Sequence, residues 1–119
     1  MTGKPDQADG YLVVGSRRLA LDADGHLADR NDWDESVAEA LARADGVGLE
    51  ADHWWLIRFA RSHFERYDTP PLMRVIVARL KKEFGPEKGT SRHLYRLFPD
   101  GPVRLACKYA GLPRPESCI

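Results

Sequence analysis

Glycine and proline residues divide the sequence from residue 32 onward into short segments, which limits the chain to short helices joined by tight turns. Within each segment apolar residues recur three or four positions apart, the spacing of one face of an α-helix. Gly46, Gly85 and Gly111 each follow such a segment, where glycine commonly ends a helix. We therefore expect a mainly helical fold with five short helices, over residues 33–44, 51–67, 70–84, 91–98 and 102–110.

Residues at the start of these segments predict where the helices begin. Asp32, followed three positions later by Glu35, has the spacing of a capping box for the first helix. Thr69 is expected to cap the third helix, with a proline in its first turn. The expected starts of the last two helices are Thr90 or Ser91, and Pro102.

The N-terminal part of the chain has a different pattern. Residues 11–14 and 17–21 are rich in strand-forming residues, and the Gly-Ser pair between them suits the two-residue turn of a β-hairpin. Residues 1–10 are polar, and we expect them to be disordered. Residues 11–111 are then one helical domain that carries the hairpin at its N-terminus.

The last eight residues, 112–119, are expected to form a mobile C-terminal arm. Two prolines among them disfavour a helix and favour an extended segment. Terminal residues are usually mobile unless packing holds them. The arm carries Cys118, the penultimate residue of the sequence.

Charge is unevenly distributed although the net charge is zero. Residues 1–57 hold 5 Lys/Arg and 12 Asp/Glu, whereas residues 58–119 hold 13 and 6. The basic half could face an acidic protein, a nucleic acid or a small anion, or it could be a solvated surface. The polar N-terminus has no apolar signal core, and no apolar run is long enough to span a membrane. We expect a cytoplasmic protein with no direct membrane insertion.

No metal centre or cofactor is expected. Two cysteines cannot build a zinc site without histidines, and the four histidines show no paired ligand spacing. We interpret them as ordinary surface or half-buried residues. They are His26, His53, His63 and His93.

The two cysteines, Cys107 and Cys118, are the candidate catalytic residues. A cysteine near a chain end packs little and is open to oxidation and exchange, which favours a chemical role for Cys118. Ten residues separate the two, and the arm can turn back because each residue spans up to about 3.3–3.6 Å. We therefore predict a reversible disulfide between them. The alternative for Cys107 is a buried core cysteine that never meets Cys118.

Basic residues surround this pair in the sequence. Cations favour a thiolate or persulfide anion, whereas Glu116 and the C-terminal carboxylate oppose one at Cys118. We expect the docked arm to have the more reactive sulfur, because docking brings it near the basic helices. The residues expected to dock the arm or a partner are Arg74, Lys88, Arg92, Arg104, Lys108 and Arg114.

The C-terminal run, residues 95–119, resembles the DsrC/TusE family through its penultimate cysteine after Gly-Leu-Pro-Arg-Pro. That family includes the gamma subunit of dissimilatory sulfite reductase and the sulfur carrier of tRNA thiolation. The resemblance covers almost the whole chain after residue 10. The matching upstream segments are residues 25–27, 31–33, 53–54, 71–75 and 85–89.

The resemblance implies a small orthogonal helical bundle with helix-turn-helix-like helices, an N-terminal hairpin and a flexible arm. It implies that Cys118 accepts and passes sulfur. Members with a second cysteine upstream resemble the dissimilatory branch, in which a trisulfide can form, so Cys107 favours that branch. Such a protein would be a sulfurtransferase-type carrier, a co-substrate of sulfite reductase rather than a stand-alone enzyme.

The partners that the resemblance implies are sulfur-transfer proteins of the DsrEFH/TusBCD and TusA type, dissimilatory sulfite reductase, and a membrane-bound thiol:disulfide reductase complex. One alternative is a one-thiol carrier for tRNA thiolation. Another is a helix-turn-helix DNA-binding regulator, in which Arg92, His93 and Arg96 would face phosphates. The zero net charge and the short fourth helix disfavour a nucleic-acid partner. A free thiol oxidoreductase is disfavoured by the lack of a Cys-x-x-Cys motif.

Overall fold

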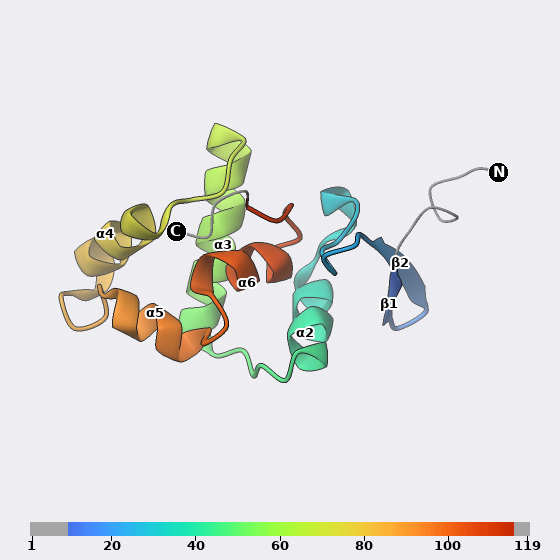
Figure 1. The fold of residues 1–119 in the computed structure, drawn as a ribbon, viewed down its shortest axis with the longest axis horizontal. Helices are drawn as coiled ribbons and strands as arrows, with labels where there is room; N and C mark the ends of the chain where they lie inside the picture. The colour runs from blue at the N-terminus through green and yellow to red at the C-terminus, as the bar shows by residue number, and fades with distance from the viewer. Residues whose placement is uncertain (1–9, 116–119) are drawn as a thin grey trace.

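The computed structural model describes residues 10–115, and it confirms a mainly helical fold with an N-terminal β-hairpin (Figure 1). Strands β1 (Gly10–Val14) and β2 (Arg17–Leu21) pair in antiparallel register, with Leu12 opposite Leu19. A 3-10 helix, η1 (Arg30–Asp32), follows. The α-helices are α2 (Glu35–Ala44), α3 (Ala51–Tyr67), α4 (Met73–Phe84), α5 (Ser91–Leu97) and α6 (Pro102–Tyr109).

Helix α6 lies at the centre of the molecule, with α2 and the hairpin on one side and α4 and α5 on the other (Figure 1). It packs against α2, α3 and α5. Six of its eight residues are buried, so the helix is enclosed on nearly every face. The core formed around it includes Val37, Leu56, Ile57, Leu94 and Phe98. No helix among residues 10–115 is both long and apolar enough to cross a membrane.

Two of the predicted helix starts are wrong. Asp32 ends η1, and it is the side chain of Asp34 that caps α2 by accepting from the Val37 N–H at 3.0 Å. Trp33, between them, has an extended backbone, so the helix begins only after it. Helix α4 begins at Met73 rather than residue 70, because a residue that precedes proline is disfavoured in helical conformation.

The other two starts are confirmed. The Thr90 hydroxyl caps α5 by accepting from the His93 N–H at 3.1 Å, and Pro102 is the first residue of α6. In the turn between α4 and α5, a Cβ on Gly89 would lie 2.4 Å from the Lys81 Cα. Only glycine fits there, which allows the turn to close tightly against α4.

Three of the four histidines are buried, contrary to the expectation of surface or half-buried residues. His53 shows why: its Nε2–H donates to the Leu97 carbonyl at 2.9 Å, and its Nδ1 accepts from the Glu50 N–H at 3.1 Å. The ring therefore supplies one donor and one acceptor to two helix ends, where backbone groups lack helical partners. His63, by contrast, is half-buried as expected.

His93 is also buried, and it connects α5 to the start of α3. Its Nε2 lies 3.1 Å from a carboxylate oxygen of Asp52, and its Nδ1 accepts from Arg96 at 3.0 Å. Lys88 completes the cluster, with its ammonium 3.2 Å from the same Asp52 oxygen. Burial raises the pKa of Asp52, but Lys88 and His93 lower it more, so that it lies below 3.8. The three interactions fasten the α4–α5 turn to α3.

Candidate thiol site at the end of the last helix

Cys107 is a free thiol near the C-terminal end of α6, and its side chain is fully buried. Burial raises its pKa from 9.0 to about 12, because the apolar interior disfavours the thiolate. The burial of Cys107 agrees with the alternative of a core cysteine, and it outweighs any effect of the cations that adjoin it in the sequence. At neutral pH its sulfur is a protonated thiol that solvent does not reach.

The cations beside Cys107 in the sequence make other contacts. The Lys108 ammonium lies 2.9 Å from a carboxylate oxygen of Asp45, which also accepts from the Tyr109 hydroxyl at 2.8 Å. The Arg104 guanidinium donates to the Asp100 carbonyl at 3.0 Å. Neighbours in sequence on a helix point in different directions, so proximity along the chain did not place these charges at the sulfur.

The four remaining residues predicted to dock the arm or a partner lie on the surface, two of them in ion pairs and two without one among residues 10–115. Lys88 and Arg114 are paired, the first with Asp52 and the second with Asp24 at 2.9 Å. Arg74 on α4 and Arg92 on α5 are exposed, and neither makes an ion pair within residues 10–115. An exposed ion pair such as that of Arg114 with Asp24 contributes little stability.

The chain leaves α6 through a tight reversal. Gly111 has a φ of +74°, the Gly111 N–H donates to the Lys108 carbonyl at 3.2 Å, and the Leu112 N–H donates to the Cys107 carbonyl at 2.9 Å. This pair of bonds is a Schellman motif. A Cβ on Gly111 would lie 2.7–2.9 Å from side-chain atoms of Trp33, so the position also requires glycine for space. The predicted helix end at Gly111 is confirmed.

Three side chains from distant parts of the chain hold residues 109–112, which we call the arm root. The indole N–H of Trp33 donates to the Tyr109 carbonyl at 2.7 Å, and the guanidinium of Arg61 donates to the Ala110 carbonyl at 2.7 Å. The ring Nδ1 of His26 lies 2.8 Å from the Leu112 carbonyl, and it must carry the proton because a carbonyl only accepts. We call Trp33, Arg61 and His26 the carbonyl clamp.

The members of the carbonyl clamp also contact one another. The Arg61 guanidinium lies over the Trp33 ring, 4.1 Å from its centroid, in a cation–π contact. Burial lowers the pKa of Arg61, yet a guanidinium stays charged at physiological pH. A positive charge at the carbonyl end of α6 is favourable for the helix dipole. Sequence reasoning missed the clamp: His26 and Trp33 fall in family-like segments, but nothing marked Arg61.

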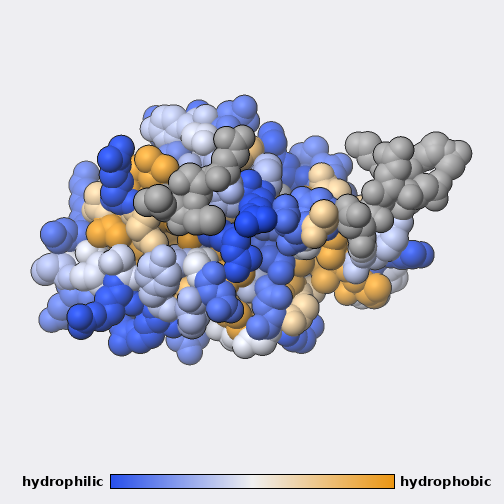
Figure 2. Space-filling view, in the orientation of Figure 1, coloured by the Kyte–Doolittle hydropathy of each residue, from blue (hydrophilic) through white to orange (hydrophobic). Residues whose placement is uncertain are grey.

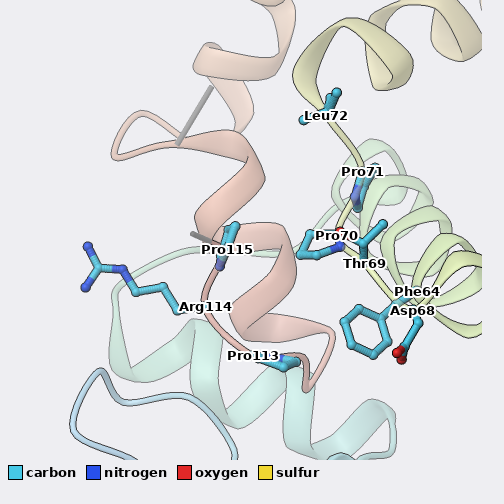
Figure 3. A pocket seen from close by; sticks show the side chains of 9 residues that line it. All are labelled: Phe64, Asp68, Thr69, Pro70, Pro71, Leu72, Pro113, Arg114 and Pro115. Atoms are coloured by element: carbon cyan, nitrogen blue, oxygen red, sulfur yellow. The ribbon is translucent and has the colours of Figure 1, made fainter. Parts of the chain in front are cut away.

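A groove runs beside the arm root (Figure 3). Its volume is about 480 Å³, and it lies between the α3–α4 connection and the start of the arm. In Figure 3, Pro115 lies across the groove from Pro70 and Pro113 lies opposite Phe64, whereas Arg114 points away from the groove. A smaller hollow of about 140 Å³ on the other side of Pro113 is lined by Asp22, Leu27, Ala28, Arg30 and Gly111.

The structure places one of the two predicted catalytic residues. Cys118 lies outside the described residues, and so does the pairing of Cys107 with Cys118. Leu112, the first residue of the predicted arm, is buried, and its N–H donates a hydrogen bond to the Cys107 carbonyl. Pro113 and Arg114 are exposed, whereas Pro115 is buried.

Comparison with known proteins covers nearly the whole chain. Residues 13–119 match the family model described as DsrC like protein. The sulfurtransferase TusE of Salmonella typhimurium is 42% identical over 108 residues, which span 91% of this chain and 99% of that protein. TusE of Pectobacterium atrosepticum is 44% identical over the same shares of the two chains.

Solved structures agree with this result. The NMR structure of Allochromatium vinosum DsrC matches with a TM-score of 0.82 and 40% identity, over 92% of this chain and 98% of that one. The crystal structure of the oxidized gamma-subunit of the dissimilatory sulfite reductase from Archaeoglobus fulgidus also gives 0.82, with 41% identity over 92% and 99%. The shared sequence, the shared fold and the match through residue 119 lead to one conclusion: the chain belongs to the DsrC-like protein family.

Proposed function

We propose that this protein is a sulfur carrier, which accepts sulfur on Cys118 as a persulfide and passes it to partner proteins. The observation that carries the proposal is the burial of Cys107, in a chain whose relatives include sulfurtransferases. The thiolate is the nucleophile in sulfur exchange. Cys107, fully buried and with a pKa of about 12, cannot take sulfur from a donor protein in this state. Cys118 on the arm is then the acceptor.

Cys107 would act second, on sulfur that Cys118 already carries. Attack of the Cys107 thiol on the inner sulfur of the Cys118 persulfide forms a Cys107–Cys118 disulfide and releases hydrogen sulfide. No external oxidant is needed, because the persulfide sulfur already holds the oxidising equivalent. The step requires α6 to open locally at the arm root, since Cys107 is buried and its carbonyl is bonded to Leu112.

The presence of Cys107 favours the dissimilatory branch, with sulfite reductase and sulfur-transfer proteins as partners. A one-thiol carrier of the TusE kind is the second candidate, because TusE proteins are 42–44% identical over nearly their full length. The DNA-binding alternative loses support. His93 is buried and bonded to Asp52, so it cannot contact a phosphate, and α5 has only seven residues.

Mass spectrometry after incubation with a persulfide donor tests the proposal. The wild-type protein and Cys107→Ala should each gain the mass of sulfur on the C-terminal peptide, and Cys118→Ala should gain none. Equal loading of Cys118→Ala would show that Cys118 is not the acceptor. The Cys107→Ala variant should retain its sulfur, whereas the wild type should convert part of it to disulfide and sulfide. The same behaviour in both proteins would support the one-thiol carrier instead.

A further inference from the structure

The carbonyl clamp supplies more hydrogen bonds to carbonyl groups than the end of a helix requires. The Schellman bonds already satisfy the carbonyls of Cys107 and Lys108, and carbonyls in a last turn are usually satisfied by water. Here the next carbonyls are bonded by side chains that lie 76, 49 and 86 residues away in sequence. These bonds join the arm root to the hairpin side of the molecule and to α3.

His26 is the clearest sign that the contact itself matters. Its side chain is fully buried, and its Nε2 has no hydrogen-bond partner in the described part of the chain. Burying a polar nitrogen without a partner is unfavourable, and an apolar side chain would fill the same space without that cost. The bond from Nδ1 to the Leu112 carbonyl is the ring's one polar contact within residues 10–115.

Backbone hydrogen bonds hold the described chain as far as Leu112. Leu112 is buried and bound twice, through its N–H and its carbonyl. Pro113 and Arg114, which follow it, are exposed, whereas Pro115 is buried beside the groove. The ion pair of Arg114 with Asp24 has both side chains about half exposed and is therefore weak. The clamp thus fixes a point of departure for the residues that lead to Cys118.

We propose that Trp33, Arg61 and His26 are positioning residues for Cys118, which act by fixing the arm root. The seven residues after Leu112 span at most about 25 Å, so the position of the root sets which surfaces the thiol can reach. A tethered group has its highest effective concentration where the tether matches the span, and a loose root dilutes it. This inference rests on the proposed function, but the clamp can be tested without sulfur.

Arg61→Met and Trp33→Phe each remove one donor and keep most of the apolar bulk. Arg58→Met is the matched control, because Arg58 lies on the same helix, pairs with Glu35 at 3.0 Å and lies over Trp54. All are made in a Cys107→Ala, Ser36→Cys background, with spin labels on Cys118 and on position 36, an exposed site of α2. The measurement is the distribution of distances between the two labels.

The two clamp variants should broaden the distance distribution, and Arg58→Met should leave it unchanged. Hydrogen exchange of the Gly111 and Leu112 amides should be about tenfold faster in the clamp variants, with exchange in α3 unaffected. Arg61→Lys should restore part of the protection. Unchanged distances and exchange in both clamp variants would overturn the proposal. If Trp33→Phe fails to fold, the comparison of Arg61→Met with Arg61→Lys decides the question alone.

The result of this test of the carbonyl clamp can be distinguished from the result of the sulfur-loading test. If Cys118 takes no sulfur but the distances broaden, the clamp positions the arm of a protein with another function. If Cys118 loads sulfur and the clamp variants keep the wild-type distances, the sulfur carrier stands and the positioning role is wrong.

Discussion

Helices α6 and α4 differ in almost every respect that decides whether a helix is a scaffold or a surface. Six of the eight residues of α6 are buried, whereas α4 buries only Ile76 and Leu80 among its twelve. Helix α6 packs against three other helices, and its end is held by the carbonyl clamp. Helix α4 has no side-chain cap at its start, and it exposes Val75 and Phe84.

Figure 2 shows apolar surface at the α4 end of the molecule, among strongly hydrophilic residues. Single exposed apolar side chains are normal on a small protein, and a contiguous patch of them is needed to mark a contact surface. The two helices therefore provide different environments for their side chains. The interior helix keeps the Cys107 thiol protonated and buried, and the peripheral helix leaves Val75 and Phe84 exposed to solvent.

The largest expected effect concerns thiol reactivity. At pH 8, a pKa of about 12 in place of 9.0 lowers the thiolate population of Cys107 by about a thousandfold. In a Cys118→Ala background, Cys107 should therefore react with a maleimide at least about a thousandfold more slowly than a thiol introduced on α4 by Val75→Cys. Stopped-flow labelling measures both. Comparable rates would mean that α6 does not shield its thiol.

The same burial gives a pH dependence of stability. Because the folded pKa of Cys107 is raised, the folded state holds its proton above pH 9, where the unfolded thiol ionises. The stabilisation is present below pH 9 and is lost as pH rises toward 12. The free energy of unfolding should thus fall more steeply above pH 9 in the wild type than in Cys107→Ala, as urea titrations would show.

The second effect compares one aromatic residue on each helix. Tyr109 on α6 is fully buried, and Phe84 on α4 is 46% exposed. Tyr109→Ala should lower the free energy of unfolding by about 3–5 kcal/mol, because it opens a cavity and leaves Asp45 without one of its donors. Phe84→Ala should cost less than about 1.5 kcal/mol, because half of its surface already faces water. Denaturant titration of both variants, with equal slopes, checks the difference.

Similar costs for the two substitutions would contradict the division into scaffold and surface. A Tyr109→Phe variant separates the contributions, since it keeps the ring and loses only the hydroxyl bond to Asp45.

The smallest effect concerns the cluster that fastens the α4–α5 turn. The pKa of Asp52 is below its ordinary 3.8 because Lys88 and His93 lower it more than burial raises it. Its stabilising contribution is present above pH 3.8 and is lost as pH falls below that value. Asp52→Asn should cost at most about 1 kcal/mol at pH 7, because the site is partly exposed and screened. The difference from wild type should shrink progressively as pH falls below 3.8.

The Asp52→Asn substitution should loosen the α4–α5 turn and leave the end of α6 unaffected. Hydrogen exchange should therefore increase in the turn around Lys88 and stay unchanged at Leu112, and faster exchange at both places would mean that the two helices are coupled.

The sequence by itself determined the helices, the hairpin and their order. Glycines after apolar segments ended α2 and α6, and Thr90 and Pro102 began α5 and α6, because caps and turns depend on neighbouring residues. The α4 start was misplaced for a local reason as well, the backbone restriction imposed by consecutive prolines. The family could also be identified from the sequence, because the residues around Cys118 form a contiguous motif.

Only the tertiary structure decided the environment of Cys107 and the anchoring of the arm root. The sequence placed Arg104 and Lys108 beside the thiol, but the fold directs them to Asp100 and Asp45 and leaves the sulfur in the core. Trp33, Arg61 and His26 come from three separate segments, and no local pattern joins them. Their contacts depend on how the helices pack around α6, and packing couples residues without regard to their separation along the chain.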